Sequence, residues 1–241
     1  MIHQQTFIMT LVNMLTHTRK NTYLYATLDA ERLGILSIKN KDAVSLSKRL
    51  LAETIKNKKQ LEYQINKVKE LQDETQSLLN LIGSDYTTKG EKLVDSLLYG
   101  LISTPLFNFN ASTLEEALNT GQISILPSDS LRILLYDIPQ KMIRIHNYEE
   151  EMTRDIENNL MPFLYNEISL RQMDQRFSEK LKLNGKSQLN HFDNRVILSM
   201  KQFENMVDNK FFLIETLQHG YDELSILFDD TINSIEKDLN K

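Results

Sequence analysis

A stripe of fifteen apolar residues in the last part of this 241-residue chain constrains its fold most strongly. Neighbouring members are three or four residues apart, and their fourteen gaps cover 50 positions, a mean of 3.57. This spacing lies between the coiled-coil repeat of 3.5 and the 3.6 residues per turn of a straight α-helix. The members are Leu189, Phe192, Val196, Met200, Phe203, Val207, Phe211, Ile214, Leu217, Tyr221, Leu224, Phe228, Ile232, Ile235 and Leu239. The stripe predicts one helix about 75 Å long, which needs an equally long partner.

A candidate partner lies in the first half of the chain, where residues 35–82 contain neither glycine nor proline. Apolar residues at helical spacing predict a long helix over residues 39–83, which Gly83 would end. Polar residues interrupt its apolar face. The predicted seam consists of Val44, Leu51, Leu61, Ile65, Val68, Leu79 and Ile82, with Ser47, Thr54, Lys58, Gln72 and Thr75 at its other positions.

The distribution of charge also favours pairing of these two helices. Residues 39–69 carry nine Lys or Arg and three acidic residues, a net charge of +6. Residues 204–241 carry nine acidic residues and three lysines, a net charge of −6. We therefore predict that the two segments pack on each other, or on those of a second copy of the chain.

Residues 88–170, between the long helices, have the start and stop signals of several shorter helices. Thr88–Glu91 and Ser112–Glu115 have the spacing of a capping box, and Ser128 precedes a further apolar pattern. Ile123–Leu126 is predicted to be a short extended segment. We expect this middle segment to form a compact helical cap at one end of the molecule.

The predicted fold class is all-α: an elongated bundle or hairpin with two long coiled-coil-like helices and a smaller helical cap. Antiparallel pairing of residues 40–82 with 188–240 is expected if one chain closes on itself. The predicted divisions are an atypical N-terminal segment (1–38), a long basic helix (39–83), the helical middle segment (88–170), a connector (171–187) and a long acidic helix (188–241).

The N-terminal segment contains an apolar run, Phe7–Leu15, which is much shorter than the roughly 20 residues of a membrane-spanning helix. The run also lacks the preceding basic region and the following small-residue cleavage site of a signal peptide. We expect a short helix that packs on the body of the protein. A degenerate or peripheral membrane contact is the alternative.

The sequence contains no recognisable catalytic or metal-binding motif. It has no cysteine, its five histidines form no HExxH pattern, and neither a GxSxG elbow nor a glycine-rich phosphate loop occurs. His146 and Glu150 are expected to form a surface pair, since they are one helical turn apart. The acidic runs Glu149–Glu151 and Asp229–Asp230 are expected to be solvated faces. We predict that the protein is not an enzyme and has no catalytic, cofactor-binding or metal-binding residues.

The basic stretch 39–69 carries positive charge that phosphates could contact. Its only aromatic residue is Tyr63, however, so it offers little for stacking on bases. Pairing with the acidic helix of the same chain is the expected role of these charges, and no nucleic-acid partner is predicted.

Short motifs in the middle of the chain resemble those of a known family. The motifs are Asp95–Tyr99, Phe107–Asn108, Thr113–Leu114, Leu118–Ile123 and Asp129–Arg132. Over roughly residues 40–240 the chain is similar to a family of uncharacterised bacterial single-pass membrane-anchored helical proteins, a domain of unknown function. The resemblance implies a bacterial, membrane-associated helical domain, without an established activity, cofactor or site residue.

The chain departs from this family where the membrane helix would end. Leu33–Leu36 resembles the tail of that helix, but Asp29, Glu31 and Arg32 precede it. Each such charge costs about 3 kcal/mol at the centre of a bilayer. We therefore expect no convincing transmembrane helix here, and the sequence leaves the compartment open.

The function expected from these observations is a non-catalytic interaction or scaffold module that self-associates or binds a protein partner through its long helices. The family resemblance adds an association with the bacterial envelope. An alternative is a sensory or ligand-binding helical domain, in which Phe107, Asn108, Asn119 and Arg132 of the middle segment contact a small molecule or peptide. An enzyme of unrecognised type would need a cluster of buried titratable groups in a cleft.

Overall fold

The computed structural model describes residues 2–83, 85–177 and 188–240, with side chains described for residues 40–83, 85–174 and 188–240. Every regular element in these ranges is helical, which confirms the all-α prediction. The α-helices are α1 (Ile2–Leu81), α2 (Glu91–Leu101), α3 (Ser112–Asn119), α4 (Asp129–Asp155), α5 (Met161–Glu167), α6 (Leu170–Phe177) and α7 (Lys201–Leu239). Shorter 3-10 or π segments are Tyr86–Thr88, Gln122–Ile125, Ile156–Leu160 and Asn194–Ser199.

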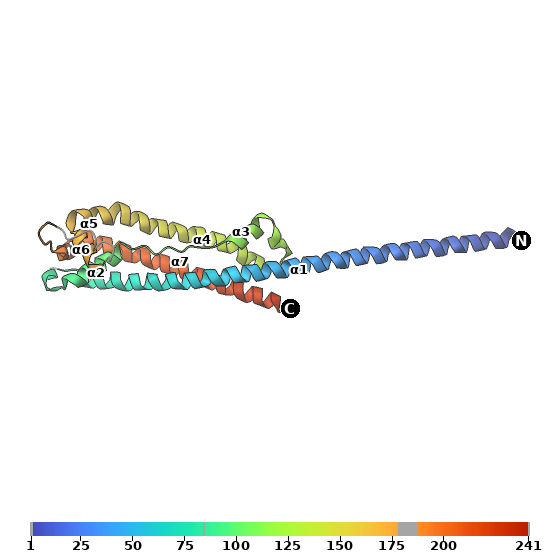
Figure 1. Ribbon diagram of the computed structural model, residues 1–241, viewed down its shortest axis with the longest axis horizontal. Helices are drawn as coiled ribbons and strands as arrows, with labels where there is room; N and C mark the ends of the chain where they lie inside the picture. The colour runs from blue at the N-terminus through green and yellow to red at the C-terminus, as the bar shows by residue number, and fades with distance from the viewer. Residues whose placement is uncertain (1, 84, 178–187, 241) are drawn as a thin grey trace.

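The two long helices α1 and α7 lie side by side and antiparallel, as expected (Figure 1). At one end the Gly83 N–H donates to the Leu198 carbonyl at 2.9 Å, and about halfway along the bundle Lys58 pairs with Asp229. Among the described side chains this ion pair is the only one between α1 and α7. Burial of apolar surface therefore holds these helices together more than their opposite charges do.

The apolar stripe of α7 faces the core from Phe203 onward. Its buried members are Phe203, Val207, Ile214, Leu217, Tyr221, Leu224, Phe228 and Ile235. Two predicted members are wrong: Lys210, not Phe211, fills the buried position between Val207 and Ile214, and Thr231, not Ile232, fills the one between Phe228 and Ile235. Lys210 follows Val207 by three residues and precedes Ile214 by four, which is the spacing of a helix seam.

The core face of α1 is turned slightly from the predicted seam. Val44, a predicted seam residue, is 42% exposed, whereas its neighbour Ala43 is buried. The buried positions run through Leu46, Leu50, Leu61, Ile65, Val68, Leu71 and Leu78, with Ser47, Thr54, Asn57 and Thr75 buried among them. The hydroxyls of Thr54 and Thr75 donate hydrogen bonds to the backbone carbonyls one turn earlier, those of Leu50 and Leu71, at 2.8 and 2.7 Å. Polar residues can therefore occupy this seam without unpaired hydrogen-bonding groups.

The middle segment is not the compact cap that we expected. Its longest helix, α4, runs along α7 as a third long helix of the bundle (Figure 1). The shorter helices lie near the two ends: α3 is at the end from which α1 extends, and α2, α5 and α6 are at the other end. The side chain of Tyr148 on α4 lies directly over Gly220, where an added Cβ would require the ring to shift slightly.

The long C-terminal helix begins later than the stripe predicts. Residues 194–199 form a 3-10 segment, and α7 begins only at Lys201. Leu189 and Phe192, the first stripe members, are 83% and 45% exposed. Asp193 caps the 3-10 segment through the Arg195 N–H at 3.1 Å, and the buried Asn194 amide donates to Asp95 at 2.8 Å. These side-chain bonds fix a non-helical turn that apolar spacing does not reveal.

Two of the three predicted N-terminal caps, and the extended segment, are wrong. The Thr88 hydroxyl bonds the Asp85 carbonyl instead of capping α2, and the Ser112 hydroxyl bonds Asn110 (2.8 and 2.7 Å). The Ser128 cap is confirmed, because its hydroxyl accepts from the Leu131 N–H at 3.2 Å. Gln122–Ile125 is a 3-10 turn rather than extended, since Gly121 adopts a left-handed conformation with φ of 73° before it.

The connector predicted over 171–187 begins with helix, since α6 extends to Phe177. Its remaining residues, 178–187, lie outside the described part of the chain. The π segment Ile156–Leu160 continues directly into α5, where Pro162 occupies the first turn. Proline lacks the N–H that a regular helix turn uses, and here it lies at the junction between the π segment and α5.

The N-terminus of α3 is capped by a side chain from another helix. The Glu53 carboxylate on α1 accepts from the N–H groups of Thr113 and Leu114, at 2.7 and 3.1 Å. A carboxylate at this place both satisfies free N–H groups and complements the positive end of the helix dipole.

Replacing Glu53 with Ala is therefore expected to destabilise α3 locally by about 1 kcal/mol. Amide hydrogen exchange of Thr113 and Leu114 should become several-fold faster. Glu62→Ala, which removes an exposed carboxylate of the same helix, is the matched control and should leave both amides unchanged. Equal exchange rates in wild type and Glu53→Ala would show that the cap contributes nothing.

The N-terminal half of α1 continues past the bundle. α1 comprises 80 residues, and its first half extends as a single helix beyond the ends of α3 and α7 (Figure 1). This differs from the short packed helix expected for residues 1–38. The side chains of Phe7–Leu15 and Leu33–Leu36 lie outside the described part of the chain. Within the described residues, no helix has a stretch long and apolar enough to cross a membrane.

Candidate binding groove and buried polar network

A segment without regular secondary structure, residues 103–111, connects α2 to α3 and runs along the bundle (Figure 1). We name it the strap. Each of the three long helices contributes one buried polar side chain that bonds the strap backbone. These bonds are Lys210 Nζ to the Ser103 carbonyl (3.1 Å), the Phe107 N–H to Glu149 Oε1 (2.8 Å), and the Asn57 amide to the carbonyl and N–H of Asn110 (2.7 and 3.0 Å).

Glu149 is the central acceptor of this network. It is only 5% exposed, so the expectation that it lies on a solvated face is wrong. Besides the strap, its carboxylate accepts from the hydroxyl of the fully buried Tyr221 at 2.6 Å. Burial, followed by this bond to a carboxylate, raises the pKa of Tyr221. A buried carboxylate is tolerated here because two donors, one from the strap and one from α7, converge on it.

Lys210 is the buried cation of the network. Its side chain lies in the core of the bundle with 1% of the residue exposed. Burial lowers its pKa from 10.5 to about 8, against a smaller opposing effect of the Asp155 charge. Its bond to the Ser103 carbonyl partly offsets the cost of desolvating the ammonium group.

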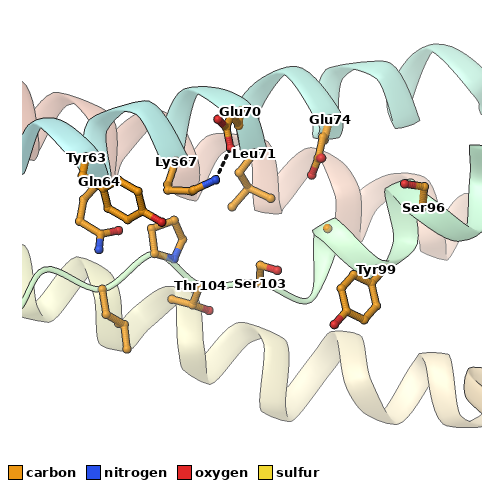
Figure 2. Close-up of a pocket in the computed structure, with 13 residues that line it drawn as sticks. Tyr63, Gln64, Lys67, Glu70, Leu71, Glu74, Ser96, Tyr99, Ser103 and Thr104 are labelled. Carbon is orange, nitrogen blue, oxygen red and sulfur yellow. Dashed lines mark hydrogen bonds and ion pairs between the residues drawn. The ribbon is translucent and has the colours of Figure 1, made fainter. Parts of the chain in front are cut away.

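A surface groove of about 470 Å³ lies between α1, α2 and the first half of the strap (Figure 2). Side chains of α1 form one wall, and the strap forms the opposite wall, with α2 closing one end. The lining residues include Tyr63, Lys67, Glu70 and Glu74 of α1, Ser96, Tyr99 and Gly100 of α2, and Ser103, Thr104, Pro105 and Leu106. The groove therefore combines helix side chains with a partly exposed stretch of backbone that has no regular secondary structure.

The two acidic residues of the α1 wall differ in their partners. Glu70 accepts from Lys67 at 2.6 Å, and the same ammonium lies 5.8 Å from the centre of the Tyr63 ring. Glu74 makes no hydrogen bond or ion pair with any described residue. Its carboxylate lies against Gly100, where a side chain would overlap it. Partial burial, and next the nearby charge of Glu70, raise the pKa of Glu74.

The four residues expected to contact a ligand do not converge on one site. Phe107 is buried in the core, where its ring meets the Tyr221 ring edge-on with centres 6.2 Å apart. Asn108 and Asn119 are exposed. Arg132 binds the Leu126 carbonyl at 2.6 Å and its neighbour Asp129, so it stabilises the start of its own helix. None of the four lines the groove. The strap residues that do line it end at Leu106, immediately before Phe107.

Other charged residues form surface pairs. His146 and Glu150 form the expected pair, 2.9 Å apart on an exposed face of α4. Within the described part of the chain, no group of three His, Asp or Glu side chains is placed to hold a metal ion. That the chain has no catalytic residue and no nucleic-acid partner stays a prediction.

No protein-family model, curated protein or solved structure matches the chain. Inferences about its role therefore rest on its own sequence and geometry.

Sequence reasoning missed most residues of the groove and the network. Lys210 and Asn57 have a sequence signal, because each occupies a core position of a helix seam despite being polar. Glu149 follows Ile145 by four residues and precedes Met152 by three, and both of these are buried. Glu74 and Gly100 have no such signal, since their proximity depends on the packing of α2 against α1.

Proposed function

We propose that the chain is a non-catalytic helical interaction module, and that copies of it associate through the N-terminal half of α1. The observation that carries this proposal is the continuation of α1 past the bundle as a single helix (Figure 1). Residues 2–42, ahead of the first buried bundle residue Ala43, would span about 60 Å. Long helices in water derive most of their stability from packing, so this extension would be stabilised by the same extension of another copy.

The bundle supplies a folded body for such a module. Its polar core groups hold the strap in place, which supports a structural role for them rather than a chemical one. The family resemblance supports a location at the bacterial envelope. In this proposal the extension joins copies of the protein, while the bundle is presented at the other end.

Light scattering coupled to size-exclusion chromatography is expected to give a mass of two or more chains for the full-length protein. Leu11→Asp, which places a charge in the apolar run Phe7–Leu15, should weaken association at least about tenfold because a charge buried in an interface is costly. Asn13→Asp adds the same charge at a polar position of that run and serves as the control. A strictly monomeric wild-type protein, across the micromolar range, would refute self-association.

A further inference from the structure

The backbone of the strap has two sides with different partners. The Ser103 carbonyl and the Phe107 N–H both bond buried side chains of the core. In an extended chain, the polar backbone groups of alternate residues point to opposite sides. Thr104 and Leu106 occupy the alternate positions between these two anchors, and their N–H and C=O groups bond no described residue, which fits an outward direction.

These two residues line the groove, and Pro105 lies between them. Proline lacks an N–H. Because Pro105 alternates with Thr104 and Leu106, the donor that it lacks would have faced the core side of the strap. The outward side thus keeps its donors and acceptors at every second residue. Such an edge is what a second extended peptide uses when it binds along a strand.

The opposite wall provides a recognition element of defined charge. The Glu74 carboxylate is directed into the groove in Figure 2 and has no partner among the described residues, whereas Glu70 is already paired with Lys67. The Tyr99 ring lies at the same end of the groove, on α2. An unpaired carboxylate, with an aromatic ring at the same end of the groove, favours a cationic side chain.

We propose that this groove binds an extended peptide segment of a partner protein, with a lysine or arginine side chain of that segment against Glu74. From Tyr63 to Glu74 the α1 wall is about 16 Å long, which corresponds to about five residues of extended peptide. This goes beyond self-association, since the groove lies on the bundle and needs no second copy of the chain.

The test uses the full-length protein and the peptide Ac-Ala-Ala-Arg-Ala-Ala-NH2, compared with the same peptide carrying neutral citrulline. Binding is followed by amide chemical shifts in a titration of nitrogen-15-labelled protein. The arginine peptide should shift Gly100, Thr104 and Leu106 and bind about fivefold more tightly than the citrulline peptide. Glu74→Gln should remove this preference, and Glu70→Gln, at an already paired carboxylate, should keep it.

Three results would overturn the proposal. The first is no detectable binding of the arginine peptide at millimolar concentration, or shifts confined to residues outside the groove. The second is an arginine preference that survives in Glu74→Gln while urea unfolding shows both variants to be folded. The third is equally tight binding of n-butylguanidinium, which has the cation without peptide groups and would indicate a small cation instead of a peptide.

Discussion

Replacing Glu149 with Ala is expected to lower the free energy of unfolding by about 4 kcal/mol. The substitution removes the shared acceptor of the Phe107 N–H and the Tyr221 hydroxyl, both of which lie in the core. Each buried donor left without a partner costs about 1–3 kcal/mol, and the lost side chain leaves a cavity as well. Urea unfolding followed by circular dichroism at 222 nm measures this loss.

Three further variants separate the contributions at this site. Glu149→Gln keeps an oxygen that can accept both bonds, so this variant should lose only about 1 kcal/mol of the free energy of unfolding. Tyr221→Phe removes one donor without stranding another group and should cost about the same. Glu150→Ala, at the exposed neighbouring position, is the surface control and should change stability by less than about 1 kcal/mol. A Glu149→Ala protein within 1 kcal/mol of wild type would show that the network does not stabilise the fold.

The second large effect has the opposite sign: replacing Lys210 with Met is expected to stabilise the protein by about 2 kcal/mol at pH 7. The pKa of Lys210 is lowered from 10.5 to about 8 in the folded protein, so its charged form is less favourable there than in the unfolded chain. This unfavourable contribution of the buried charge to the free energy of folding is about 3 kcal/mol, and it disappears in the variant. Loss of the bond to the Ser103 carbonyl costs about 1 kcal/mol.

The pH dependence follows from the same shift. Between pH 8 and 10.5 the unfolded chain retains a proton on Lys210 that the folded protein has released, so wild-type stability gains from this group as the pH rises. The advantage of Lys210→Met should therefore be fully present below pH 8 and disappear as the pH approaches 10.5. Urea unfolding at pH 7, 8.5 and 10 measures it, with the exposed Lys201→Met as control. A stability difference between Lys210→Met and wild type that is independent of pH would contradict the lowered pKa of Lys210.

Much of the bundle follows from the spacing of apolar residues, because a buried helix face must repeat with the period of the helix. Between Phe203 and Ile235 most members of the stripe were predicted from this spacing alone and are buried as expected; Phe211 and Ile232 are the exceptions, because Lys210 and Thr231 occupy the buried positions. The same rule failed at Leu189 and Phe192, which have the right spacing but lie outside α7. There the buried Asn194 and its bond to Asp95, a residue 99 positions away, determine the local backbone.

The caps and the groove show a second limit of sequence reasoning. A capping box describes bonds within four residues, and it cannot show that Glu53 replaces Ser112 as the acceptor for α3. Likewise, Glu74 and Gly100 are unremarkable in sequence and become related only when α2 packs on α1. The strap anchors Asn57, Glu149 and Lys210 were not predicted either, since the seams predicted from the sequence placed Lys58 and Phe211 beside the true core positions.

The three strap anchors also have a consequence for the axial alignment of the bundle. Long helices with regular apolar seams can slide past each other by a heptad, about 10 Å, and still bury apolar side chains. Asn57, Glu149 and Lys210 are on three different helices, and each bonds a separate point of one continuous backbone. A slip of any helix would break its anchor, so the segment without regular secondary structure gives the bundle a single register.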